Sequence, residues 1–276
     1  MGRLWILMMV VGCSDYQVHK RADFGPVPEA EVSLIDTAVM ALDTGDAPVT
    51  EDTAEPEEPV IEVPDEPVYL HEGGTLYSWS PLEGRLRIVG NFFREDDGEV
   101  EGVTDITDIA IDASGHFYGV SYSTVYGING HTAEVWPIAS IAFPMFGLTC
   151  TYDGRLIGAG DGLFEIDTVT GAISTLVPEG QYETAGDIVG LPDGLLYWAV
   201  REGEALVVVD PDSGVVVPRG EIGTENIYGL GYAEGSLYGF TEEGQALEIS
   251  PTTGEVLSEQ ALPGAWWGAT TNPVVW

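Results

Sequence analysis

The chain has 276 residues, 44% of them hydrophobic, which is enough to bury a sizeable core in one or two domains. Its 46 acidic and 9 basic residues give a net charge of −37, and such a field repels phosphate backbones and anionic lipid surfaces. The composition therefore argues against a nucleic acid as partner. It favours cations, basic partners or simply a solvated acidic surface.

The first predicted element is an export signal in residues 1–13, which read MGRLWILMMVVGC. After Arg3, an apolar run over residues 4–11 is too short to span a bilayer but has the length of a signal-peptide core. The run ends in Val-Val-Gly-Cys, which resembles the lipobox of bacterial lipoproteins. This resemblance implies cleavage after Gly12 and acylation of Cys13, which would anchor the exported protein to the bacterial cell envelope, at the outer membrane or the cell surface. The alternative is an ordinary secretory signal with an incidental cysteine.

Residues 14–67 are predicted to form an acidic, Pro- and Thr-rich disordered tether. They hold 15 acidic and 2 basic residues and almost no aromatic ones. High net charge with few large apolar side chains cannot offset the entropy lost when a chain becomes ordered. Prolines and charge repulsion also extend such a segment. We therefore expect a spacer between the membrane and a folded domain over residues 68–276.

The folded domain is predicted from an internal repeat. An apolar strand, a tight turn ending in glycine and a second strand recur four times, with the turn glycines 39, 40 and 41 residues apart. These glycines are Gly115, Gly154, Gly194 and Gly235. A second strand–turn–strand motif follows each copy, and its weakest version, in residues 125–138, has Ala133 at the turn position. Each unit is thus four short strands in about 42 residues, the pattern of a β-propeller blade.

The two ends of the domain complete one another. Residues 68–84 align without a gap with residues 238–254, an offset of 170 residues, so the domain opens on the second strand of a blade. Residues 266–272 align with a first strand and supply the one that is missing. We therefore predict an all-β fold, a β-propeller of about five four-stranded blades whose last blade is closed by the N- and C-terminal strands. Such closure leaves no free edge between blades.

Short strings in the repeats resemble known propellers. VVVDPDSG in residues 207–214 and LPDG in residues 191–194 resemble bacterial propellers of the NHL, YVTN and quinoprotein-like repeat families. The resemblance implies architecture only, because propellers host enzymes, binding modules and scaffolds alike.

Propeller topology predicts which face carries a site. Loops that join second to third strands, and one blade to the next, share a face; here they vary in length and carry many acids, with an insertion at residues 91–105. Function usually resides on such loops. The residue seven before each first-turn glycine is expected near the channel mouth. These positions and their near neighbours include six candidate ligand-binding residues: Asp108, Asp187, Asn226, Tyr228, Trp266 and Trp267.

These residues have a functional and a structural interpretation. Asp108, Asp187 and Asn226 have the oxygen ligands that calcium prefers, and the aromatic faces suit a sugar. By resemblance to propeller enzymes with an ion at the channel mouth, that ion would activate water in a hydrolase or lactonase. In the structural interpretation, which we favour, the aspartates satisfy strand-end amides and the aromatic residues pack between blades.

The leading functional hypothesis is a binding module rather than an enzyme. It would capture a protein or carbohydrate ligand through the acidic loop face, with calcium the one cofactor considered. No catalytic residue is assigned, because the sequence has no G-x-S-x-G elbow, P-loop or H-E-x-x-H motif. The metal-dependent hydrolase and a structural scaffold of the envelope are the alternatives.

Overall fold

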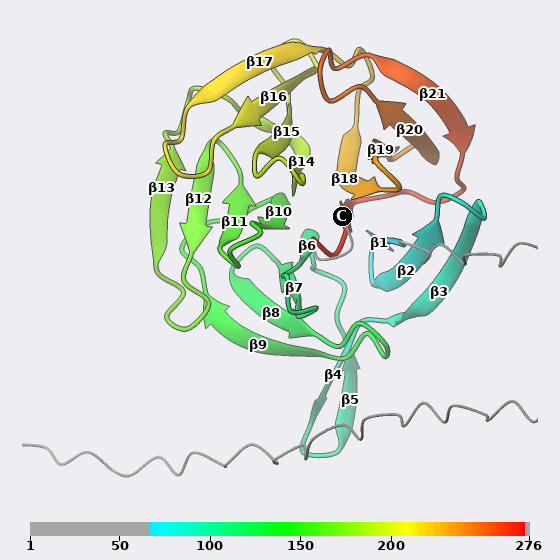
Figure 1. Cartoon of the computed structure of the whole chain (residues 1–276). Coiled ribbons are helices and arrows are strands. Elements are labelled where there is room, and N and C mark those ends of the chain that lie inside the picture. The colour runs from blue at the N-terminus through cyan, green and yellow to red at the C-terminus, as the bar shows by residue number, and fades with distance from the viewer. Residues whose placement is uncertain (1–66, 274–276) are drawn as a thin grey trace, which may run out of the picture. The chain divides into compact units, whose positions relative to one another are not determined.

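The computed structural model of the chain describes residues 67–273, which form a ring of five four-stranded antiparallel sheets (Figure 1). This confirms the predicted all-β propeller. No helix in the described part of the chain is long and apolar enough to cross a membrane. The predicted signal with Cys13, and the tether up to residue 66, lie outside the described residues.

The strands follow one another from the axis outward in every blade. Blade 1 contains β22 (Gly268–Thr270), β1 (Val68–Glu72), β2 (Thr75–Ser80) and β3 (Arg85–Asn91). Blade 2 contains β6 (Asp108–Ile111), β7 (Phe117–Val120), β8 (Thr124–Ile128) and β9 (Val135–Ser140). Blade 3 contains β10 (Gly147–Cys150), β11 (Leu156–Ala159), β12 (Leu163–Ile166) and β13 (Ile173–Val177). Blade 4 contains β14 (Thr184–Gly190), β15 (Leu196–Val200), β16 (Ala205–Val209) and β17 (Val216–Glu221). Blade 5 contains β18 (Ile227–Ala233), β19 (Ser236–Thr241), β20 (Gln245–Ile249) and β21 (Val256–Ala261).

Blade 1 closes the ring by joining the two ends of the described chain. β22 pairs antiparallel with β1, as the alignment of the domain ends predicts. The Trp267 N–H also donates to the His71 carbonyl at 3.0 Å, and the Ala265 N–H donates to the Glu72 carboxylate at 3.1 Å. The residues just before β22 are therefore fixed at the inner end of blade 1.

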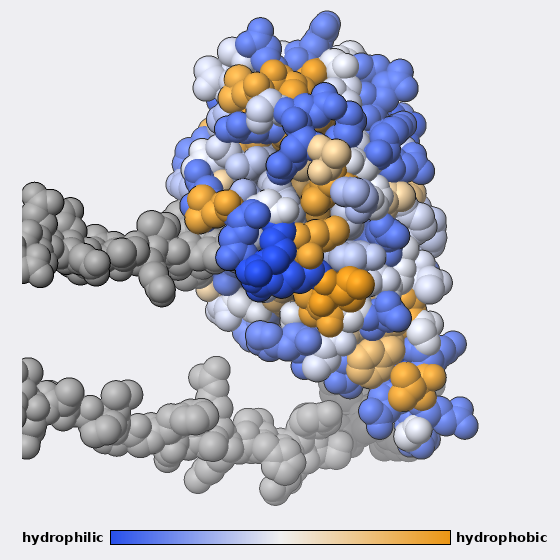
Figure 2. Space-filling view, turned by 90° about the vertical axis from the view of Figure 1, so that its right-hand side faces the viewer, coloured by the Kyte–Doolittle hydropathy of each residue, from blue (hydrophilic) through white to orange (hydrophobic). Residues whose placement is uncertain are grey.

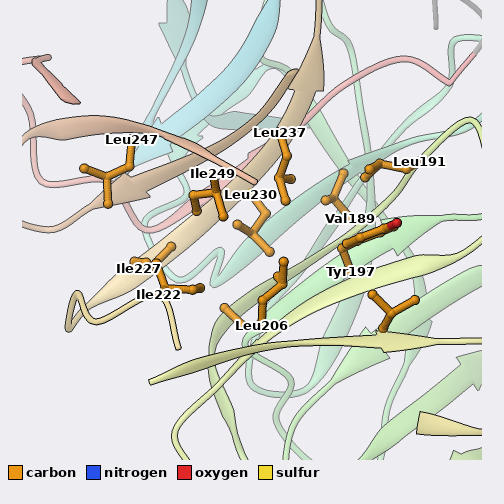
Figure 3. Close-up of a cluster of buried hydrophobic side chains, with 12 residues drawn as sticks. Val189, Leu191, Tyr197, Leu206, Ile222, Ile227, Leu230, Leu237, Leu247 and Ile249 are labelled. Atoms are coloured by element: carbon orange, nitrogen blue, oxygen red, sulfur yellow. The ribbon is translucent and has the colours of Figure 1, made fainter. Parts of the chain in front are cut away.

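The hydrophobic core lies between blades rather than at the axis. Five clusters of buried apolar side chains each draw on two neighbouring blades, one cluster for each interface of the ring. Figure 3 shows the cluster between blades 4 and 5, where Val189 and Tyr197 meet Leu230 and Leu237. Both faces of the inner strands are thus buried, which explains their nearly continuous apolar sequences.

The outer rim carries a different surface. Figure 2 shows the rim at β3 and β21, where charged and apolar side chains are mixed. β3 alternates Arg85 and Arg87 with Leu86 and Ile88, and charges on an edge strand discourage pairing with another chain.

The 91–105 insertion forms its own small element. β4 (Phe93–Asp96) and β5 (Glu99–Gly102) make a hairpin that projects from the ring between blades 1 and 2 (Figure 1). Its turn residues Asp97 and Gly98 have φ angles of 51° and 82°, which suit the tight turns that join two adjacent strands.

Candidate functional site

A pocket of about 520 Å³ lies at one mouth of the central channel. Its wall includes one residue from each blade, in every case a residue that lies next to or within the start of the inner strand. These residues are Thr107, Phe146, Gly186, Tyr228 and Trp267. Loops between the second and third strands complete the wall, so the mouth pocket lies on the loop face that the repeat pattern indicated.

Directly below these residues, the five inner strands are joined by two buried carboxyl groups. Asp108 of β6 accepts hydrogen bonds from the N–H groups of Ile109 at 2.8 Å and Leu148 at 2.5 Å. Asp187 of β14, which is also completely buried, binds the N–H groups of the inner strands on the other side of the axis. The N–H donors to Asp187 are Ile188 at 2.5 Å, Leu230 at 2.5 Å and Ala269 at 3.3 Å. One backbone N–H from each of the five blades is therefore bound by this aspartate pair.

Burial opposes ionisation of both carboxyl groups of the aspartate pair. Burial raises the pKa of Asp187 to about 7, although hydrogen bonds from Asp108 and from backbone N–H groups oppose the shift. Burial, followed by the charge of Asp187, raises the pKa of Asp108 well above its usual range. Two carboxyl groups in contact cannot both ionise without strong repulsion. The pair therefore binds at least one proton at neutral pH.

Small residues leave room for the aspartate pair at the axis. A Cβ on Gly268 would collide with Asp108 Oδ1 and would lie 2.6 Å from His71 Nε2. His71 is fully buried beside this position, and burial lowers the pKa of its imidazole to about 4, so the ring is neutral. The backbone of Thr107 and Gly73 opposes that shift, but within the described residues neither ring nitrogen has a partner with hydrogen-bond geometry.

Of the six candidate residues, Asp108 and Asp187 meet at the axis and Tyr228 and Trp267 line the mouth pocket. Asn226 lies behind the wall, where it accepts a hydrogen bond from the Tyr228 hydroxyl and donates to Glu243, both at 3.0 Å. Trp266 is fully buried and its indole N–H donates to the Leu262 carbonyl at 2.9 Å. Trp266 therefore packs between blades, away from the pocket wall.

The geometry supports the structural interpretation of the aspartates. Their oxygens accept five backbone N–H groups, whereas the Asn226 amide is hydrogen-bonded to Tyr228 and Glu243. Over residues 67–273, no group of three or more His, Cys, Asp or Glu side chains is placed to hold a metal ion.

The expected equivalence of Tyr228 with Asp108 is displaced by one residue. In blade 2, Ile111 pairs with Phe117 across the first turn, whereas in blade 5 Ala233 pairs with Ser236 across only two residues. Seven residues before the turn glycine of blade 5 therefore lies one residue before the position that is equivalent to Asp108. Gly229 is the equivalent of Asp108, and Tyr228 belongs to the wall above it.

Two aromatic wall residues were not anticipated from the sequence. Tyr122 and Phe146 are 59% and 42% exposed, and their rings meet edge to face with centroids 6.2 Å apart. Phe146 immediately precedes Gly147, the blade 3 equivalent of Asp108, so the repeat alignment contained a signal for it. With Trp267, the mouth pocket has three of the five exposed aromatic side chains in the described chain.

The charged groups of the mouth pocket are predominantly acidic. Asp105, Asp161, Glu183 and Glu242 line it together with one basic residue, Arg201. The Arg201 guanidinium Nε lies 3.3 Å from the Glu183 carboxylate and donates to the Thr184 carbonyl at 3.0 Å. Within residues 67–273, the other three carboxylates form no ion pair.

Comparison with known proteins supports the fold. No family model and no curated protein sequence matches the chain. A chain in the crystal structure of a nidogen/laminin complex is similar, with a TM-score of 0.51 and 9% identity over 75% of this chain and 98% of that one. U3-55K gives a TM-score of 0.45 at 11% identity, over 71% of this chain and 61% of that one. A protein of unknown function from Bacteroides caccae gives 0.43 at 9% identity, over 72% of this chain and 73% of that one. The first likeness shows a shared propeller fold and nothing about ligands.

Proposed function

We propose that this chain is an exported, lipid-anchored bacterial binding protein whose propeller captures a ligand or partner protein at the mouth pocket. The observation that carries the proposal is the convergence of all five blades on one open pocket that is rich in exposed aromatic side chains. Exposed aromatic groups are enriched where proteins bind partners, because they offer large contact areas at little conformational cost.

The closed ring suits this role because it fixes the pocket before a ligand arrives. The wall residues adjoin strands whose N–H groups are held by Asp108 and Asp187, and little ordering remains to be done on binding. We assign no catalytic group, since the aspartate pair serves the backbone.

The N-terminal part of the proposal comes from the sequence. The apolar run before Cys13 supports export and lipidation, and the composition of residues 14–67 supports a spacer that holds the propeller away from the membrane. The repeat strings favour a propeller related to the NHL, YVTN and quinoprotein-like groups. In this arrangement the tether displays the binding face to other envelope molecules or to the surroundings of the cell.

Photocrosslinking in the cells that make the full chain tests where it binds. A benzoylphenylalanine replaces Tyr122 in the mouth pocket or, as the control, Tyr152, which is 70% exposed in the turn between β10 and β11 on the opposite face. We expect a defined crosslinked product from position 122 and none from position 152. Crosslinks from position 152 alone would assign binding to the face opposite the mouth pocket and overturn the proposal.

A further inference from the structure

The carboxylates of the mouth pocket point to the charge of its ligand. Arg201 is neutralised by Glu183, which leaves Asp105, Asp161 and Glu242 without a counter-ion in the described chain. The surrounding domain adds to this field, because residues 68–276 hold 31 acidic and 6 basic side chains. A ligand that enters the mouth pocket therefore gains most if it is cationic.

The aromatic wall points to the chemical type of that cation. Tyr122, Phe146 and Trp267 come from successive blades and expose their rings at the pocket. The faces of aromatic rings attract ammonium and guanidinium groups, Trp most strongly, and carboxylates nearby add to the attraction. A bare metal ion would instead need several oxygen or nitrogen ligands converging on one point, and residues 67–273 hold no group of three or more His, Cys, Asp or Glu side chains placed in that way.

We infer that the mouth pocket recognises lysine or arginine side chains on a basic segment of a partner protein. This inference rests on the proposed function and names its ligand class. The pocket volume of about 520 Å³ holds several residues rather than one side chain, and further acids, Asp96, Asp97, Glu99 and Glu101, lie on the β4–β5 hairpin. Both features fit an extended basic peptide, with a Lys or Arg side chain at the aromatic wall and further cations in the surrounding field.

Fluorescence anisotropy with the full-length chain tests the inference. The probe is a labelled ten-residue peptide of alternating lysine and glycine, and its control has glutamine at every lysine. We expect saturable binding of the lysine peptide, weakening as salt is added, and no binding of the glutamine peptide. The absence of saturable binding by the lysine peptide would overturn the inference.

Matched variants separate the pocket from the general negative field. Trp267→Ala removes a pocket ring that is 42% exposed, and Trp136→Ala removes a β9 ring that is 47% exposed outside the pocket. Glu242→Gln and Glu99→Gln each remove one charge, inside the pocket and on the hairpin respectively. We expect Trp267→Ala and Glu242→Gln to weaken the affinity about three- to tenfold, and both controls to change it less than about twofold.

The outcomes distinguish this inference from the proposed function. Equal losses for Glu242→Gln and Glu99→Gln, with none for Trp267→Ala, would show diffuse charge attraction and overturn the inference alone. Binding of a neutral oligosaccharide such as maltohexaose that depends on Trp267, with no preference for the lysine peptide, would keep the pocket as the binding site and contradict its cationic specificity. If crosslinking also assigns capture to the opposite face, both proposals fall.

Discussion

At the scale of single residues, Asp108 and Asp187 explain how the buried N–H groups at the axis of a closed ring find hydrogen-bond acceptors. The five inner-strand N–H groups are buried, and each would cost about 1–3 kcal/mol without an acceptor. Two carboxyl groups supply all five acceptor positions, and Gly268 leaves the space that they need.

The raised pKa of Asp187 makes the stability of the ring dependent on pH. The folded-state pKa of Asp187, about 7, exceeds its ordinary value of 3.8, so the folded chain binds more protons than the unfolded chain between these limits. The free energy of unfolding should therefore fall by on the order of 2–4 kcal/mol as the pH rises from about 4 to about 7. Urea denaturation across this range measures the decline.

A variant and a direct titration isolate the pair from the other acids. Asp187→Asn should flatten much of the slope, because it removes the carboxyl whose pKa burial raises, whereas Glu99→Gln on the exposed hairpin should leave it unchanged. If Asp187→Asn does not fold, a carbon-13 NMR titration of the natural chain still reports the pair. Two carboxyl groups that both titrate near pH 4 would contradict the raised pKa values.

The role of the aspartate pair was open at the level of sequence for a physical reason. Asp at the mouth of a propeller channel suits a cation and a strand-end N–H equally well, and only the positions of neighbouring blades decide between them. Once the blades are aligned, the same inner-strand position holds Asp or Gly in every blade: Asp108, Gly147, Asp187, Gly229 and Gly268. That alignment needed the two-residue turn of blade 5, which turn glycines alone do not reveal.

At the scale of elements, the turns between third and fourth strands differ in how closely they contact a neighbouring blade. Gly214 in the β16–β17 turn has a φ of 67°, and a Cβ there would collide with the Leu176 carbonyl of blade 3. Gly84 in the β2–β3 turn has a similar φ of 60° but has open space around it. The turn of blade 4 therefore packs tightly against blade 3, whereas the equivalent turn of blade 1 has open space around its glycine.

This difference predicts unequal effects of one substitution. Gly84→Ala should cost about 1 kcal/mol, because only the left-handed backbone conformation is penalised. Gly214→Ala should cost about 3 kcal/mol or more, because the backbone of two blades must also move apart. Thermal unfolding of the two variants makes the comparison, and equal losses would show that the turns do not contact neighbouring blades.

Elements were predicted from the sequence where the repeat was regular and missed where it was interrupted. The four strands of each blade follow from period-two apolar patterns between turn residues. The β4–β5 hairpin was expected only as an insertion, although Asp97-Gly98 is a strong turn signal. Its strands alternate few apolar residues and bury no common face, so the pattern that identifies blades is absent there.

At the scale of the whole molecule, closure of the ring builds the mouth pocket. Trp267 reaches the wall because β22 pairs with β1, far away in the sequence. The alignment of the two domain ends predicted this pairing and the face on which loops gather. It could not predict Tyr122 and Phe146 as a contacting pair, because their approach depends on the angle between blades 2 and 3.

If a basic polypeptide binds at the mouth of the closed ring, its binding must change the surroundings of Trp267. Two tryptophans of similar exposure, Trp267 in the mouth pocket and Trp136 on β9, report on this claim within one spectrum. Indole N–H resonances of the nitrogen-15-labelled full chain are followed while the lysine peptide is added, with each signal assigned by a Trp→Phe variant. We predict a saturable shift of the Trp267 resonance and a stationary Trp136 resonance. A shift of Trp136 with Trp267 unmoved would contradict the account.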